Sequence, residues 1–123
     1  MTQQELKDRL TNFAIRIVKM VDCLPNTISA NAIARQIVRS GTSPSANYRA
    51  ACLGKSDKDF LNKLKMVEEE LDETSHWLVI IMRTGMLPES RVADLYTENI
   101  ELLKIIVRSI ITVKNRINTD KLI

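Results

Sequence analysis

One short motif in this sequence has the residue types and spacing of a metal site. The tetrapeptide "ETSH" places Glu73 and His76 three residues apart, which is the Glu-x-x-His unit that supplies ligands in di-metal helical bundles. Such a site needs two of these units and two further glutamates from facing helices. Because the chain contains only one histidine, the sequence predicts no metal site and no cofactor.

The rest of the sequence also argues against catalysis. It contains no glycine-rich phosphate loop, no cluster of cysteine and histidine, and no recognisable pair of nucleophile and base. We therefore predict that the protein is not an enzyme and that it has no catalytic residues.

A basic segment is the stronger candidate for a functional site. From Cys23 to Ser56 the chain has no aspartate or glutamate. The cations of this segment are Arg35, Arg39, Arg49 and Lys55. Arg35 and Arg39 are four residues apart and share a helix face, where they can neutralise phosphates of a nucleic acid. We interpret the four residues as candidate nucleic-acid contacts, although a solvated basic face needs no ligand.

The formal net charge of the whole chain is only +3, so a single copy would attract nucleic acid weakly. An oligomer would multiply this charge and create a continuous basic rim. Further cations follow near the C-terminus, at Lys104, Arg108, Lys114, Arg116 and Lys121.

The elements that must position these residues follow from composition and periodicity. The chain has 123 residues, of which 45% are hydrophobic and 27% charged, and this balance predicts one soluble domain over residues 1–123. The N-terminal residues lack an apolar signal segment, and the longest apolar run, "WLVIIM", is too short to cross a membrane. We expect a cytoplasmic protein with no membrane partner.

Apolar residues recur at alternating steps of four and three in three segments, which indicates amphipathic helices. The first stripe runs from Leu6 to Leu24 and ends before Pro25. The second runs from Phe60 to Ile81, between a capping signal at Ser56 and a left-handed stop at Gly85.

The third stripe runs from Tyr96 to Ile117, after Pro88 in a first helical turn. A further helix is predicted from about Ser29 to Leu53. Its inner side is expected to carry small residues, namely Ala30, Ala34, Ala46 and Ala51. Short connections force neighbouring helices to run antiparallel, so the sequence predicts an all-α, up-down-up-down four-helix bundle.

The stretch "VRSGTSPSANYRAACLGKS" interrupts this regular pattern with small residues and Pro44. Proline removes a backbone N–H and clashes with the preceding turn, so the second helix should be kinked near Gly41–Pro44 or restart with Ser43 as its N-cap. Two interpretations remain open. The small residues form a close-packed kink, which we favour, or they contact a ligand directly.

The same stretch carries a family resemblance, together with "DFLNKLKMVEEELDETSHWL". Over about residues 37–78 the chain resembles the four-helix-bundle proteins encoded in intervening sequences of 23S ribosomal RNA genes. The motif residues that match are Ser40, Gly41, Thr42, Ser43, Ala46, Asn47, Tyr48, Glu70, Asp72, Glu73, Thr74 and Trp77.

The resemblance implies a left-handed bundle that assembles into a ring, commonly a homopentamer, with a poorly defined molecular role. Distant fold relatives of that family include accessory proteins of diversity-generating retroelements, which are basic pentameric bundles that bind nucleic acid and a reverse transcriptase. This functional analogy rests on fold alone.

Three further expectations come from the residues themselves. Cys23 and Cys52 are predicted to be reduced, buried thiols, because the chain lacks a secretory signal and the two lie at opposite ends of the bundle. Glu70 and Glu73 should meet arginines across helices or subunits. The protein should not be a monomer, because several apolar residues lie beside the predicted core stripes. These residues are Trp77, Ile80, Leu95, Leu102 and Ile105.

The sequence therefore predicts a non-enzymatic, oligomeric four-helix bundle that acts as an accessory factor associated with RNA or DNA. The alternative is a protein interaction scaffold that binds a protein partner and no nucleic acid. The two hypotheses differ in salt dependence, because displaced counterions drive only the first kind of binding.

Overall fold

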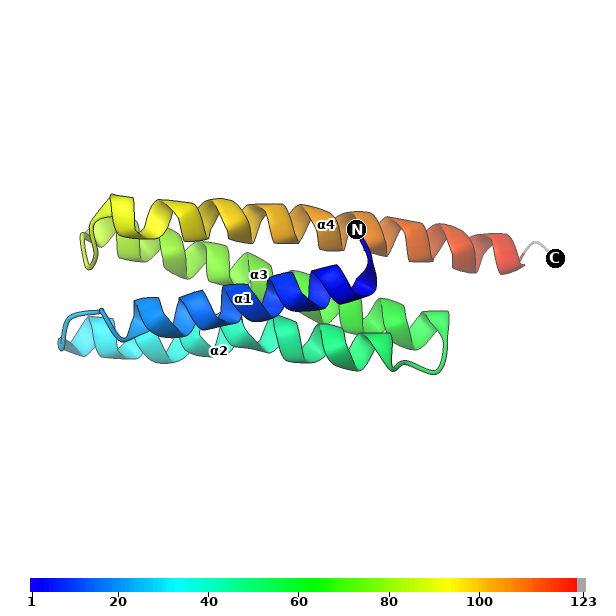
Figure 1. The fold of residues 1–123 in the computed structure, drawn as a ribbon, viewed down its shortest axis with the longest axis horizontal. Helices are drawn as coiled ribbons and strands as arrows, with labels where there is room; N and C mark the ends of the chain where they lie inside the picture. Colours follow the sequence, from blue (N-terminus) through cyan, green and yellow to red (C-terminus); the bar gives the residue numbers. More distant parts are fainter. Residues whose placement is uncertain (122–123) are drawn as a thin grey trace.

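The computed structural model describes residues 1–121, which form four helices joined by short turns. The helices are α1 (Gln3–Val21), α2 (Ile28–Cys52), α3 (Asp57–Thr84) and α4 (Glu89–Lys121). Successive helices run in opposite directions (Figure 1). The predicted all-α four-helix bundle is thereby confirmed.

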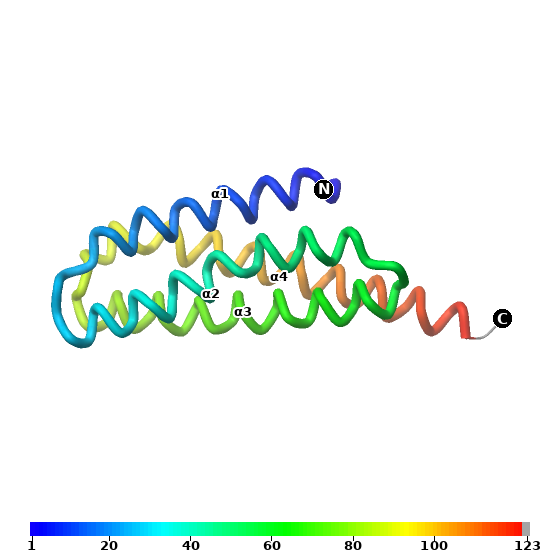
Figure 2. Tube along the Cα trace, turned by 90° about the horizontal axis from the view of Figure 1, so that it is seen from below, coloured from blue at the N-terminus to red at the C-terminus, as the bar shows by residue number. Residues whose placement is uncertain are grey.

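Helices that follow one another in the chain pack closely, whereas the first and last helices do not. The α1–α2, α2–α3 and α3–α4 pairs pack extensively, whereas α1 and α4 touch much less. Figure 2 shows that α1 separates from the other helices toward its N-terminus, and that α4 continues well beyond the start of α1. The two helices therefore leave a gap over the C-terminal half of α4.

Local residues explain most helix ends. The Ser56 hydroxyl accepts a hydrogen bond from the Asp59 backbone N–H at 3.1 Å and caps α3. Gly85 ends the same helix with a φ of 72°, a left-handed conformation that favours glycine. The end of α1 differs from the prediction, because the helix stops at Val21 and Leu24 lies in the turn. Proline disfavours helical geometry in the residue before it, so Pro25 shortens the helix.

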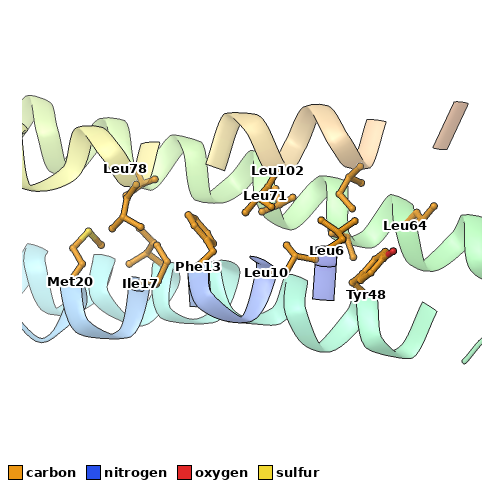
Figure 3. Packing of buried hydrophobic residues seen from close by; sticks show 14 of the residues in the cluster. Leu6, Leu10, Phe13, Ile17, Met20, Tyr48, Leu64, Leu71, Leu78 and Leu102 are labelled. Atoms are coloured by element: carbon orange, nitrogen blue, oxygen red, sulfur yellow. The ribbon is translucent and has the colours of Figure 1, made fainter. Parts of the chain in front are cut away.

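The core is aliphatic, with single aromatic contributions from Phe13 and Tyr48. Figure 3 shows side chains of α1 facing residues of α3 and α4 along the bundle axis. Every predicted stripe residue of α1 inside the helix, and every one of α3 after Phe60, is buried. Among the described helices, none combines the length and the apolar character needed to cross a membrane.

The stripe on α4 agrees with the prediction at Asn99, Ile106, Ile110 and Val113, which are buried, but differs at two steps. Leu95 and Leu102 are 5% and 0% exposed, whereas Tyr96 and Leu103 are only half-buried. The expectation that Leu95 and Leu102 lie on a surplus apolar surface is wrong, because the bundle itself covers them. The apolar argument for an oligomer then depends on Trp77, Ile80 and Ile105, which are half-buried in the single chain.

Helix α2 passes through Pro44 without interruption. A restart of the helix at Ser43 is therefore excluded, and a kink near Gly41–Pro44 stays a prediction. Two nearby hydroxyls donate to backbone carbonyls of the same helix: Thr42 to Val38 at 2.6 Å and Ser45 to Thr42 at 2.8 Å. Both accepting carbonyls precede Pro44 in the chain, so the hydroxyls bond to the backbone of the turns that lead into the proline.

The two cysteines are free thiols, as expected, but they are not both buried. Cys52 is half-buried, whereas Cys23 is exposed because α1 ends before it and leaves it in the turn. The Cys23 sulfur accepts a hydrogen bond from the Arg91 guanidinium at 3.5 Å. The prediction of a buried hydrophobic role is wrong for Cys23.

Candidate nucleic-acid interface

Three of the four predicted nucleic-acid contacts are exposed and unpaired. Arg35 and Arg49 lie on the outer face of α2, and Lys55 lies in the turn that follows. None of these three side chains forms an ion pair within residues 1–121. Since α2 itself contains no acidic residue, this face presents positive charge that no nearby carboxylate on the helix offsets.

Arg39 has a different environment from the other three cations. Its guanidinium is paired with the Glu73 carboxylate of α3, and the same carboxylate oxygen accepts a hydrogen bond from the Trp77 indole N–H at 3.0 Å. About half of the Arg39 side chain, 51%, stays exposed. Glu73 thus meets an arginine as expected, and this pairing reduces the charge that Arg39 offers to a phosphate.

A buried polar contact lies between α2 and α3, next to this ion pair. Ser40 and Thr74 are both 0% exposed, and their hydroxyl oxygens lie 2.9 Å apart and share a hydrogen bond. The Thr74 hydroxyl also donates to the Glu70 carbonyl at 2.8 Å. Because unpaired hydroxyls are costly in a core, this mutual satisfaction fixes how α2 sits along α3.

Glu70 meets no arginine within residues 1–121, and an arginine of a neighbouring subunit stays a prediction. The Glu70 carboxylate accepts a hydrogen bond from the Asn47 side-chain amide at 2.7 Å. Three side-chain contacts therefore join α2 to α3: the pairs Arg39–Glu73, Ser40–Thr74 and Asn47–Glu70. We call this set the α2–α3 polar seam. It places most polar residues of the family motif in one helix interface.

Gly41 lies at a close contact between α2 and α1. A β-carbon added at this position would lie 2.9 Å from both Cγ1 and Cγ2 of Ile17, which is closer than real side chains approach. Gly41 is buried, so a ligand in solvent could not reach it. The small residue is used here for a close helix contact.

The other small and polar motif residues are placed variously. Thr42 and Ser43 are half-buried, and Tyr48 is in the core. Asp72 and Ala46 are exposed, so the placement of Ala46 on the inner side of the helix is wrong. Ala46 lies on the same outer face as Arg39 and Arg49, seven residues after the first and three before the second.

The Glu-x-x-His motif is not arranged as a ligand set. His76 is exposed and its ring lies 5.0 Å from the Trp77 ring, while Glu73 is engaged by Arg39 and Trp77. Within residues 1–121, no group of three or more histidine, cysteine, aspartate or glutamate side chains is placed to hold a metal ion.

Arg35 and Arg39 share a helix face, but only Arg39 forms an ion pair within residues 1–121. The contribution of this pair to stability can be measured. Replacing Arg39 with glutamine is expected to lower the free energy of unfolding by about 0.2 to 1 kcal/mol, the range for exposed ion pairs. The matched change Arg35→Gln should stay within about 0.5 kcal/mol of the parent. Urea denaturation of both variants tests this, and equal stabilities would show that the Arg39–Glu73 pair contributes nothing.

Sequence reasoning missed a groove between α1 and α4. It is lined by residues of all four helices, among them Arg9, Tyr48, Phe60 and Arg108. The sequence drew attention to several of these residues separately, Tyr48 as a motif residue and Arg108 as a C-terminal cation among them, but did not place them together. The groove arises because α1 separates from α4 (Figure 2), and no local sequence pattern encodes that separation.

Comparisons with known proteins agree on one family. The profile of the family described as 23S rRNA-intervening sequence protein matches residues 3–108. A solved structure from Bacteroides thetaiotaomicron, described as a protein of unknown function from the S23 ribosomal protein family, is 34% identical with a TM-score of 0.80. The alignment covers 85% of this chain and 97% of that one. No functionally curated protein matches the chain significantly.

Proposed function

The chain belongs to the 23S rRNA-intervening sequence protein family, and from this premise we propose that it is a non-enzymatic, oligomeric bundle that binds nucleic acid as an accessory factor. The observation that carries the proposal is the acid-free outer face of α2. There Arg35, Arg49 and the neighbouring Lys55 are exposed and form no ion pair with any described residue.

The geometry of this face suits phosphate contacts. Arg35 and Arg49 lie about 21 Å apart along the helix, a distance that spans several phosphates of one strand. Long cationic side chains on an exposed helix face approach phosphates without entering a groove. Such contacts position a protein on nucleic acid but do not read the bases, so we propose binding with little sequence preference.

Assembly strengthens the proposal. Each added copy contributes three more unpaired cations from this face, and a ring would arrange them around one rim. We propose a homo-oligomer, with the pentamer taken from the resemblance to the family. The half-buried residues Trp77, Ile80 and Ile105 are the apolar surface that neighbouring copies would cover.

One observation favours the alternative, a protein interaction scaffold. Leu53 is 82% exposed and Met66 is 44% exposed. Both line a surface hollow that also includes Lys55 and Lys63. Exposed apolar residues that line one hollow are typical of protein contacts.

A triple variant tests the nucleic-acid proposal. We expect the changes Arg35→Gln, Arg49→Gln and Lys55→Gln together to weaken binding to all RNA and DNA sequences alike. The plot of log affinity against log salt should become shallower by about 0.9 for each duplex phosphate that the variant no longer neutralises. Folding should be retained, because glutamine is a good helix former. Binding isotherms at several salt concentrations, on protein of mass determined by light scattering, measure this.

A second triple variant serves as the control, because it removes the same charge elsewhere. Lys7, Arg83 and Lys121 lie on α1, α3 and α4, respectively, and form no ion pair within residues 1–121. If both triple variants weaken binding equally, only net charge matters and the α2 face is not the site. If the parent binds no nucleic acid at low salt, the scaffold function replaces this proposal.

A further inference from the structure

The groove between α1 and α4 has a volume of about 740 Å³. One wall is the N-terminal part of α1, as far as Arg9, and the other runs along α4 from Glu101 to Arg116. Figure 2 shows the same part of α1 turning away from the rest of the bundle. The first turns of α1 therefore have less support from neighbouring helices than the rest of that helix.

Within residues 1–121, side-chain hydrogen bonds join α1 to another helix at one point only. Arg9 donates from Nε and Nη2 to the two carboxylate oxygens of Glu98 on α4, each at 2.7 Å. The other side-chain hydrogen bonds of α1 stay within the helix or its caps. By contrast, three side-chain contacts join α2 to α3 in the polar seam.

The Arg9–Glu98 pair has the geometry of a strong ion pair. Its two parallel N–H···O bonds form the bidentate arrangement in which arginine binds a carboxylate best. The side chains of Arg9 and Glu98 are only 33% and 19% exposed, so water screens the pair less than it screens an ion pair on an open surface. The hydrogen bond to Glu98 raises the pKa of Arg9, which keeps the guanidinium charged.

Apolar contacts hold both halves of α1, but the second half has a firmer anchor. Leu6 and Leu10 in the first half are 3% and 1% exposed and pack in the core. In the second half, Ile17 lies so close to α2 that a β-carbon on Gly41 would be 2.9 Å from its side chain. This contact fixes the second half against α2. The groove beside the first half leaves that half the easier one to detach.

From these observations we propose that the first half of α1, residues 3–10, is a lid on the bundle that the Arg9–Glu98 pair latches to α4. When the lid opens, the groove widens onto Tyr48 and Val113, which line it and are almost fully buried in the closed state. Local opening takes place where a segment has few contacts with the rest of the molecule. The inference concerns the folded chain itself and does not depend on whether the protein binds nucleic acid.

Hydrogen exchange of the folded protein measures this opening. We expect Arg9→Gln to speed the exchange of the backbone amides of residues 6–10 about three- to tenfold, the effect of losing a partly exposed bidentate ion pair. Amides in the middle of α3 should keep their rates, because α2, α3 and α4 stay packed. The control is Arg116→Gln, which removes an equally bidentate pair with Asp57 between α4 and α3 and should leave the α1 amides unchanged.

The double variant Arg9→Gln/Glu98→Gln shows whether the pair itself is the latch. Either single change breaks the same bonds, so the double variant should exchange its α1 amides about as fast as a single variant rather than at the product of the two effects. Parental rates for the α1 amides of Arg9→Gln would show that the pair holds no lid. Equal acceleration in all four helices would also overturn the proposal, because α1 would then open only when the whole bundle unfolds.

A thiol of the chain provides a second readout. Cys52 is half-buried and lines a hollow together with Gln3 at the start of α1, so opening of the lid uncovers it. In a Cys23→Ser background, a thiol reagent should label Cys52 about three- to tenfold faster when Arg9→Gln is added, in step with the α1 amides. Arg39→Gln, which breaks an ion pair between α2 and α3, should leave the labelling rate unchanged. Labelling at the same rate with and without Arg9→Gln would contradict the lid.

Discussion

Replacing Gly41 with leucine is expected to lower the free energy of unfolding by about 1 to 3 kcal/mol, the range for overpacking a close contact. A β-carbon alone at this position would lie 2.9 Å from two side-chain carbons of Ile17. The contacted carbons are attached directly to the branched Cβ of Ile17, which itself lies 3.3 Å away, and such a side chain is stiff at χ1, so it has little room to move aside. Thermal and urea denaturation of the purified variant measure the effect.

Two companion variants separate overpacking from other causes. Ala46→Leu adds a leucine side chain to the same helix at an exposed position and should change stability by about 0.5 kcal/mol or less. Combining Gly41→Leu with Ile17→Ala should cost less than the sum of the single changes, because the smaller residue makes room. If Gly41→Leu melts like the parent, α1 and α2 do not approach each other as described.

Truncating Leu102 to alanine should have a still larger effect, a decrease of about 2 to 5 kcal/mol in the free energy of unfolding. Leu102 is 0% exposed in the single chain, so its removal leaves a cavity inside one bundle. Ile111→Ala is the control, because Ile111 is on the same helix and 53% exposed. That change should cost far less.

The same pair of variants tests the rotation of α4 about its own axis. Denaturation gives the stability of each variant, and light scattering gives its mass. If Leu102→Ala keeps the stability of the chain but splits an oligomer, then Leu102 faces a neighbouring copy. The sequence-based assignment of Leu102 to the surface would then be correct, and the burial in the single chain would be wrong.

The sequence by itself determined the parts of this protein that depend on neighbours along the chain. Helix caps act within a few residues, so Ser56 and Gly85 could be assigned from local chemistry. The steps of four and three identified the buried face of α1 and α3, because side chains at this spacing share one face of a helix. The four-helix arrangement followed, since short turns allow only antiparallel neighbours.

Only the tertiary structure decided the features that depend on residues far apart in sequence. On α4, apolar side chains occupy both 95 and 96 and both 102 and 103, so periodicity permits either residue of each pair to face the core, and contacts with the other helices select Leu95 and Leu102. The partner of Arg39 lies 34 residues away on another helix, and no local pattern distinguishes this arginine from Arg35. The groove depends on the separation of α1 from α4, which results from how whole helices pack rather than from any short stretch of sequence.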